Sequence, residues 1–169
     1  MGAPSAPKDS EEYGPACLAS PYERGTDGPR TILVGVDGTQ NSLRAAAYAL
    51  GLARRQHCRL IVAFVASPSV FTSAAMGVAS IAAIAQEQCF DELAKELKEM
   101  ARRRAEEYRV PITFLQRRGD AFAELKKIAD EAAADMVVVG TSGRSSYRLR
   151  GSIANRLVRA GRWPVVAVP

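Results

Sequence analysis

The chain has 169 residues, a length that suits one domain with a short additional tail. Hydrophobic residues make up 47% of it and charged residues 24%, as in an ordinary globular protein. No apolar run reaches the roughly 18 residues that a membrane span needs, and the amino terminus lacks a secretory pattern. The three cysteines are isolated and have no metal-ligand spacing, so we expect a reducing, cytoplasmic location.

The net charge of +5 is unevenly distributed along the sequence. Residues 141–169 hold six arginines and no acidic residue, whereas the first 140 residues hold 17 basic and 18 acidic groups. A local positive field of this kind requires either an anionic partner or an exposed basic face.

Residues 1–29 contain five prolines, several glycines and serines, and few large apolar side chains. Such a segment cannot bury enough surface to offset the entropy of ordering it. We therefore expect a disordered tail over 1–29 and a folded domain over 30–169.

Apolar patterning divides the rest of the chain into alternating strands and helices. Five short apolar runs are typical of buried parallel strands, at 31–37, 59–66, 111–116, 135–140 and 164–168. Helical spacing predicts helices over 40–56, 84–108, 121–132 and a last segment marked by Ile153, Leu157 and Val158. Residues 69–82 are ambiguous between loop and helix. The alternation predicts an α/β fold with a parallel sheet and helices on both faces.

Glycine-containing turns follow the first and the fourth predicted strand. In an open α/β sheet, ligands bind beyond the carboxyl ends of the strands, where the direction of winding reverses. If these two strands are neighbours, both turns face one crevice. The turns are Val36-Asp37-Gly38 and Gly140-Thr141-Ser142-Gly143.

The second turn has the chemistry of a phosphate site. Gly140 and Gly143 let the backbone approach a ligand closely, and successive amides can form an anion-binding nest. Gly151 and Ser152 open the last helix, whose free N–H groups also favour an anion. Arg144 adds positive charge within the same loop.

Simpler interpretations of the same residues stay open. A glycine after a buried strand is often only a turn, so Gly140 and Gly143 alone are weak evidence for a phosphate site. Asp37 can cap the helix after Gly38 without contacting any ligand. The prediction of a ligand therefore depends on the combination of both turns with the arginine-rich segment.

In combination, these motifs resemble the universal stress protein family, and the resemblance covers 30–169. They are Ile-Leu-Val-Gly-Val-Asp-Gly-Thr at 32–39, Val-Val-Gly-Thr-Ser-Gly at 138–143, Gly-Ser-Ile-Ala at 151–154 and Pro-Val-Val-Ala-Val at 164–168. The resemblance implies a flavodoxin-like or Rossmann-like three-layer sandwich whose five-stranded parallel sheet has the order 3-2-1-4-5. In that order the first and fourth strands are neighbours.

The resemblance also implies an adenine nucleotide as the ligand, either ATP or one of AMP and ADP, with Mg²⁺ as an optional companion. It implies that Ser152 and the loop glycines contact phosphates and ribose, that Asp37 lies against the nucleoside, and that Val65 offers backbone contacts to adenine. The complete set of expected binding residues is Val36, Asp37, Gly38, Val65, Gly140, Thr141, Gly143, Arg144, Gly151, Ser152 and Ile153.

The loop after the fourth strand departs from the family pattern. Nucleotide-binding members carry G-x2-G-x9-G-[ST], whereas seven residues separate Gly143 from Gly151 in this sequence. The loop either follows a tighter path or holds phosphates differently, and its arginines could replace lost backbone contacts. The departure concerns the phosphate cradle rather than the adenosine pocket.

The resemblance implies a stress-response regulator or sensor that forms a homodimer. The dimer would pair through the last strand, with residues Val165, Val166, Ala167 and Val168. Two alternatives stay open: a dimer that binds no nucleotide and acts through protein partners, and a basic nucleic-acid-binding module. Tyr147 and Trp163 beside the six arginines would serve the second alternative.

An enzymatic function has little support in the sequence. His57 is the single histidine and falls at the end of a predicted helix, where the helix dipole favours a cation. The sequence shows neither a Ser-His-acid set nor a P-loop lysine. We expect at most slow ATP hydrolysis, with Asp37 positioning a magnesium-bound water.

Overall fold

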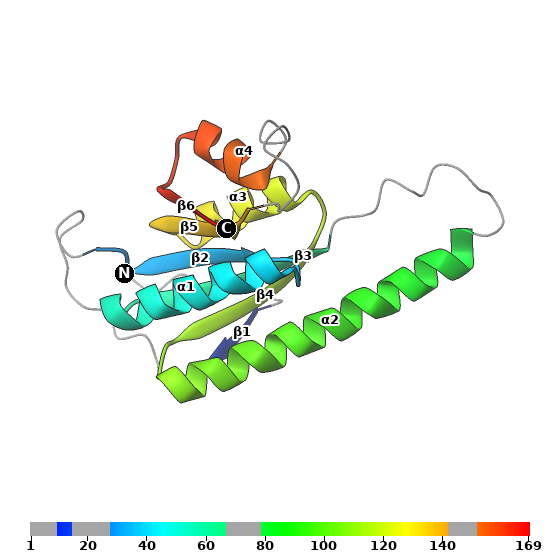
Figure 1. The fold of residues 1–169 in the computed structure, drawn as a ribbon, viewed down its shortest axis with the longest axis horizontal. Helices are drawn as coiled ribbons and strands as arrows, with labels where there is room; N and C mark the ends of the chain where they lie inside the picture. Colours follow the sequence, from blue (N-terminus) through cyan, green and yellow to red (C-terminus); the bar gives the residue numbers. More distant parts are fainter. Residues whose placement is uncertain (1–9, 15–27, 67–78, 142–151) are drawn as a thin grey trace.

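The computed structural model describes residues 10–14, 28–66, 79–141 and 152–169, which fold around one six-stranded sheet (Figure 1). The strand order is β1-β4-β3-β2-β5-β6, and β2 to β6 are parallel. Those five strands have the predicted 3-2-1-4-5 order, which is confirmed. The strands are β1 (Ser10–Tyr13), β2 (Thr31–Val36), β3 (Arg59–Ala66), β4 (Ile112–Arg118), β5 (Met136–Gly140) and β6 (Val165–Val168).

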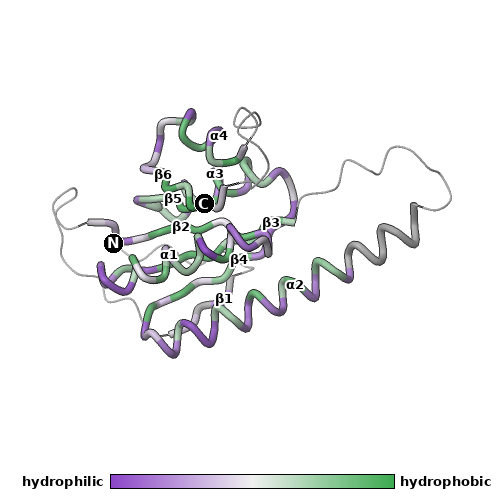
Figure 2. The backbone as a smooth tube through the Cα atoms, viewed as in Figure 1, coloured by the Kyte–Doolittle hydropathy of each residue, from purple (hydrophilic) through white to green (hydrophobic). Residues whose placement is uncertain are grey.

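Four helices in the described ranges complete the predicted three-layer sandwich. They are α1 (Gln40–Gln56), α2 (Ala79–Tyr108), α3 (Ala121–Glu131) and α4 (Ile153–Ala160). Helices α1 and α2 pack on one face of the sheet, and α3 and α4 pack on the other. In Figure 2 the tube of α2 alternates between hydrophilic and hydrophobic residues, as expected for a helix with one face on a sheet.

Each central strand contributes to two cores, because successive side chains point to opposite faces of a sheet. In β2, Ile32 and Val34 pack toward α1 and α2, whereas Leu33 packs toward α3 and α4. All three side chains are completely buried. This burial on both faces explains why the strands are continuous apolar runs instead of alternating polar and apolar residues.

The prediction of a disordered tail over 1–29 needs correction at Ser10–Tyr13, which form β1. This strand pairs antiparallel with β4, from Ser10 opposite Leu115 to Tyr13 opposite Ile112. Composition argued against order, but an existing sheet edge supplies the hydrogen-bond partners that a short strand lacks on its own. The other tail residues, 1–9 and 15–27, lie outside the described part of the chain.

Helix ends follow the local rules, and two boundaries differ from the prediction by more than one residue. Asp120 caps α3 by accepting from the Ala123 N–H at 2.9 Å, and exposed His57 ends α1 with a φ of 52°. α2 begins at Ala79 rather than 84, and β4 continues to Arg118 because it pairs with β3 as far as that residue. None of the helices in the described ranges is long and apolar enough to cross a membrane.

Candidate functional site

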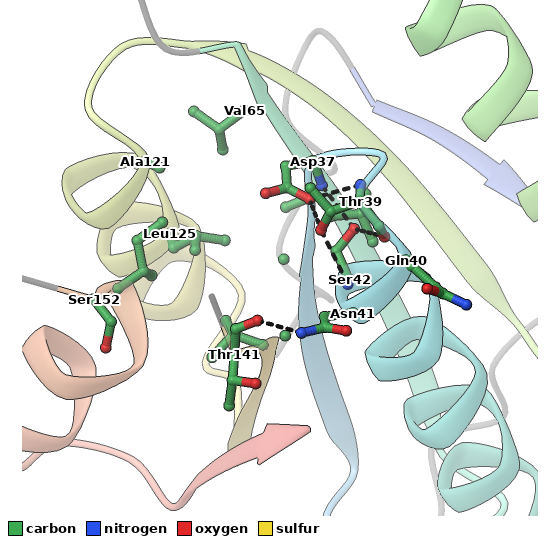
Figure 3. A pocket seen from close by; sticks show the side chains of 16 residues that line it. Asp37, Thr39, Gln40, Asn41, Ser42, Val65, Ala121, Leu125, Thr141 and Ser152 are labelled. Carbon is green, nitrogen blue, oxygen red and sulfur yellow. Dashed lines mark hydrogen bonds between the residues drawn. The ribbon is translucent and has the colours of Figure 1, made fainter. Parts of the chain in front are cut away.

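A pocket of about 800 Å³ opens at the carboxyl ends of β2, β3 and β5 (Figure 3). The chain leaves β2 toward β3 on one side and reaches β5 on the other, so this is where the winding reverses. The volume falls within the roughly 300–1,000 Å³ of small-molecule sites. Its walls include seven expected binding residues: Val36, Asp37, Val65, Gly140, Thr141, Ser152 and Ile153.

Of the other four expected residues, only Gly38 is described, and it does not line the pocket. Gly38 turns the chain between β2 and α1 with a φ of +82°, and an added Cβ would lie 2.9 Å from the Leu93 Cδ2 atom. Its position is therefore explained by the turn and by packing against α2. Gly143, Arg144 and Gly151 lie outside the described residues.

Asp37 sits at the pocket edge in a network of hydrogen bonds with the start of α1. Its Oδ1 accepts from the Thr39 N–H at 3.0 Å and from the Thr39 hydroxyl at 2.6 Å. Partial burial acts to raise the pKa of Asp37, but the Thr39 and Ser42 hydrogen bonds outweigh it, so the pKa is lowered. Asp37 is therefore ionised at neutral pH and brings a negative charge to the pocket.

Asp37 contributes to the cap of α1 indirectly, by binding the capping residue Thr39. Thr39 is the N-cap of α1, and its Oγ1 accepts from the Ser42 N–H at 3.3 Å. Asp37 holds that hydroxyl in place by accepting a hydrogen bond from it. Its other carboxylate oxygen points toward the open side of the pocket in Figure 3. The residue can therefore stabilise the helix start and contact a ligand at the same time.

Gly140 is required by close packing, whether or not a ligand binds. An added Cβ would lie 2.6 Å from both the Asn41 carbonyl carbon and the Ser42 nitrogen, which are backbone atoms. Around this contact, the Asn41 Nδ2 donates to the Thr141 carbonyl at 2.7 Å, and the Thr141 N–H donates to the Val168 carbonyl at 2.7 Å. The end of β5 is thus held against α1, and a substitution at 140 tests folding rather than binding.

Ser152 faces the pocket from the side opposite Asp37 (Figure 3). It is the N-cap of α4, where its Oγ accepts from the Asn155 N–H at 3.2 Å. Accepting this bond leaves the hydroxyl proton available for a ligand oxygen. The positive end of the α4 dipole reinforces that preference for an anion.

An ion pair fixes the start of α4 against α3. Arg156 donates to both Asp120 carboxylate oxygens at 3.1 Å, and its guanidinium lies 4.3 Å from the Phe122 ring centroid. Asp120 also caps α3, and its pairing with Arg156 depends on a residue 36 positions away along the chain. No local pattern in the sequence could have revealed it.

Several further wall residues were missed by sequence reasoning. The apolar part of the wall and the first turn of α1 supply Gly35, Thr39, Gln40, Asn41, Ser42, Ala63, Ala121, Leu125 and Val139. The polar run at 39–42 follows directly after Gly38, and its place at a strand end could have indicated it. The α3 residues could not have been found in this way, because only the tertiary fold brings that helix over β3.

The described side chains of the pocket offer few ligands for a metal ion. Asp37 is the single acidic side chain among the described lining residues. No group of three or more His, Cys, Asp or Glu side chains within the described ranges could hold a metal ion. Mg²⁺ commonly binds through one or two carboxylates together with substrate phosphates, so Asp37 would need phosphate oxygens beside it.

Known proteins resemble this chain in both sequence and structure. A universal stress protein of Methanocaldococcus jannaschii, MJ0531, is 28% identical over 142 residues, covering 82% of this chain and 81% of the relative. A universal stress protein family structure from Burkholderia pseudomallei is 26% identical with a TM-score of 0.58, covering 83% of this chain and 96% of that one. A universal stress protein solved in complex with cAMP is 28% identical with a TM-score of 0.55, covering 83% and 96%.

The match to the family itself spans nearly all of the described fold. The model of the universal stress protein family matches residues 28–169, which include the five parallel strands and all four helices. The chain therefore belongs to the universal stress protein family.

Proposed function

We propose that this protein binds an adenine nucleotide in the pocket at the ends of β2, β3 and β5 and acts as a cytoplasmic stress-response regulator. The observation that carries the proposal is the pocket itself: about 800 Å³ at the reversal of winding, lined by seven residues expected from the sequence. A family member that is 28% identical was solved with cAMP, which supports an adenine nucleotide as the ligand class.

The charge distribution of the pocket favours one orientation of the ligand. Ionised Asp37 would repel phosphates, but its carboxylate can accept hydrogen bonds from ribose hydroxyls. Ser152, at the positive end of α4 on the opposite side, suits phosphate oxygens. The apolar wall at Val65, Ala121 and Leu125 suits the adenine ring. The nucleoside would lie toward β2 and β3, and the phosphates toward α4.

The choice among ATP, ADP, AMP and cAMP depends on the loop after β5. In the proposed complex, Gly143, Arg144 and Gly151 would complete the phosphate contacts, with the seven-residue spacing setting how many phosphates fit. Mg²⁺ would join only with phosphates that share it with Asp37. A nucleotide held there would change the surface that partner proteins meet.

The primary experiment is calorimetric titration of the full chain with ATP, ADP, AMP, cAMP and adenosine, with mass spectrometry of any ligand that copurifies. Ala121→Leu fills the adenine side of the pocket and should weaken every adenine ligand about tenfold or more. Ala123→Leu is the matched control, because Ala123 is exposed on the same helix and does not line the pocket. Equal affinities in the two variants, or no saturable binding of any of these ligands, would refute the proposal.

The proposed orientation has its own test. Ser152→Gly keeps a tolerated helix cap but removes the hydroxyl, so it should weaken ATP binding and leave adenosine binding nearly unchanged. The ratio of ATP to adenosine affinity, measured in the wild type and the variant, isolates the phosphate side of the site. If adenosine loses as much affinity as ATP, the phosphates do not lie at α4.

A further inference from the structure

A second cavity, of about 440 Å³, lies on the other face of the sheet between α1 and α2. Its floor comes from the strands, with Val36, Leu60, Val62 and Ile112. Its walls come from the two helices, with Leu43, Ala46, Ala47, Leu50, Gly51 and Arg54 on α1 and Leu97, Met100, Ala101, Arg104 and Tyr108 on α2. We call it the α1–α2 groove.

Small residues keep the groove open. Ala46, Ala47 and Gly51 face it from α1, and Ala101 faces it from α2, so little side-chain volume fills the seam between the helices. Met100 on the rim is 38% exposed. A water-accessible apolar surface of this kind is costly unless a ligand or a partner covers it.

One end of the groove is positively charged. The guanidinium carbons of Arg54 and Arg104 each lie 5.6 Å from the centroid of the Tyr108 ring. Arg104 also donates to the Tyr108 hydroxyl at 3.2 Å and pairs with Glu107 at 3.0 Å. The Tyr108 hydroxyl keeps its own proton to donate. No acidic side chain is found among the described residues that line the groove.

We propose that the α1–α2 groove binds a single-chain fatty carboxylate. The hydrocarbon tail lies along the apolar seam, and the carboxylate accepts hydrogen bonds from Arg54 and the Tyr108 hydroxyl. Arg54 carries the main charge contact because Arg104 is already paired with Glu107. The site is separated by the sheet from most of the nucleotide pocket, although Val36 lines both.

The length of the groove indicates the length of the tail. Leu43 and Arg54 lie about 16 Å apart along α1 at a rise of about 1.5 Å per residue, and Leu97 and Tyr108 have the same separation in sequence on α2. A saturated chain advances about 1.3 Å per carbon, given a C–C bond of about 1.5 Å. A tail of about ten to twelve carbons therefore spans the groove.

The polar end distinguishes this occupant from a second copy of the chain. A homodimer contact would need only the apolar rim, where Met100 is exposed. Two arginines and a tyrosine hydroxyl gathered at one end are instead suited to a monoanion on an apolar tail. Each tail methylene that enters the seam should strengthen binding about three- to fourfold.

The experiment titrates the full chain with octanoate, decanoate and dodecanoate below their micellar concentrations, with dodecanol as the uncharged probe. We expect one molecule bound per chain, affinity rising with length to dodecanoate, and dodecanol about tenfold weaker than dodecanoate because it lacks the charge. Thermal unfolding run in parallel should show stabilisation, which separates binding from detergent-like denaturation.

Matched variants assign the binding to the groove. Arg54→Gln should weaken dodecanoate about tenfold, whereas Arg55→Gln, an exposed neighbour outside the groove, should leave it unchanged. Ala47→Leu fills the seam and should weaken dodecanoate with intact far-UV dichroism. Three outcomes would each overturn the proposal. The first is equal dodecanoate affinity in the two arginine variants, and the second is dodecanol binding as tightly as dodecanoate. The third is a chain that binds no dodecanoate but forms a concentration-dependent dimer that Ala47→Leu abolishes.

Discussion

Residue 140 has no space for even a methyl group, because the α1 backbone approaches it so closely. A Cβ there would meet the Asn41 and Ser42 backbone at 2.6 Å, and neither atom can move without shifting the helix. The phosphate-site hypothesis offered one explanation for glycine at position 140. Close packing against α1 is a second explanation, and it is independent of any ligand. This packing excludes a larger side chain whether or not a nucleotide is bound.

A pair of glycine substitutions tests this packing. Gly140→Ala should lower the free energy of unfolding by about 1–3 kcal/mol, because it overpacks backbone against backbone. Gly51→Ala in α1 meets only the Arg55 side chain, at 3.2 Å, and should raise it by about 0.5–1 kcal/mol through helix propensity. Chemical denaturation of both variants measures the contrast. Equal stability of Gly140→Ala and the wild type would contradict the close approach of β5 to α1.

The charge of Asp37 predicts a pH dependence of stability. Its pKa is lowered in the folded state, so its hydrogen bonds with Thr39 contribute fully above the unfolded value of about 3.9 and are lost as pH falls through the folded pKa. The difference in unfolding free energy between the wild type and Asp37→Asn should therefore be largest near neutral pH and shrink below about pH 4. Denaturation curves from pH 3 to 7 measure it, and a difference that grows on acidification would be inconsistent with this role.

At the scale of elements, the Asp120 carboxylate, next to the first residue of α3, has two functions. Asp120 caps α3 and also pairs with Arg156 of α4, whose Ser152 cap faces the pocket. The Arg156 hydrogen bonds, followed by the Ala123 N–H, lower the pKa of Asp120, so the pair stays charged at neutral pH. This contact therefore links the start of α3 to the helix whose cap faces the pocket.

Two substitutions separate the functions of Asp120. Asp120→Ala loses both the cap and the ion pair and should lower the free energy of unfolding by about 1–2 kcal/mol. Arg156→Gln keeps the cap but loses a half-exposed ion pair and the guanidinium contact with Phe122, and should lower it by about 1 kcal/mol or less. If α4 is positioned by this contact, both variants should also weaken ATP binding more than adenosine binding. Equal destabilisation by the two changes would mean that the cap contributes nothing.

At the scale of the whole molecule, the two edges of the sheet differ. β1 covers the free edge of β4, and β6 forms the opposite edge of the described sheet. The carbonyls of Pro164, just before β6, and of Val168 accept from the Val137 and Thr141 N–H groups. Alternation along a strand then turns the backbone groups of Val165 and Ala167 outward. Since unpaired strand edges favour association, this geometry supports the proposed homodimer through β6.

Proline substitutions in β6 test whether a dimer pairs through this strand. Ala167→Pro removes an outward N–H and should convert a dimer to a folded monomer, because the pairing with β5 uses the other residues. Val166→Pro, one residue earlier, removes an N–H that faces β5 and should instead destabilise the fold. Light scattering at tens of micromolar protein, combined with thermal unfolding, distinguishes the outcomes. A monomeric wild type would refute the dimer.

The sequence predicted site residues wherever a turn with polar residues or glycine directly follows a strand. Asp37 and Gly140 end neighbouring strands, so their meeting could be predicted once the strand order was assumed. Ala121 and Leu125 could not be predicted, because their place in the wall depends on how α3 packs over β3 in the tertiary structure. Tyr13 shows the same limit in the tail: its segment has the composition of a disordered chain, yet it pairs with β4.

The amino-acid sequence by itself determined the five parallel strands, the helices between them, the turns at Asp37 and Gly140, and the resemblance to the family. These features depend on local periodicity and on turn residues, which act over a few positions. Only the tertiary structure decided the pairing of β1 with β4, the tight contact at Gly140, the Asp120–Arg156 link and the α1–α2 groove. Each of these depends on residues distant in the sequence meeting at specific distances, and hydrophobic patterning does not encode such distances locally.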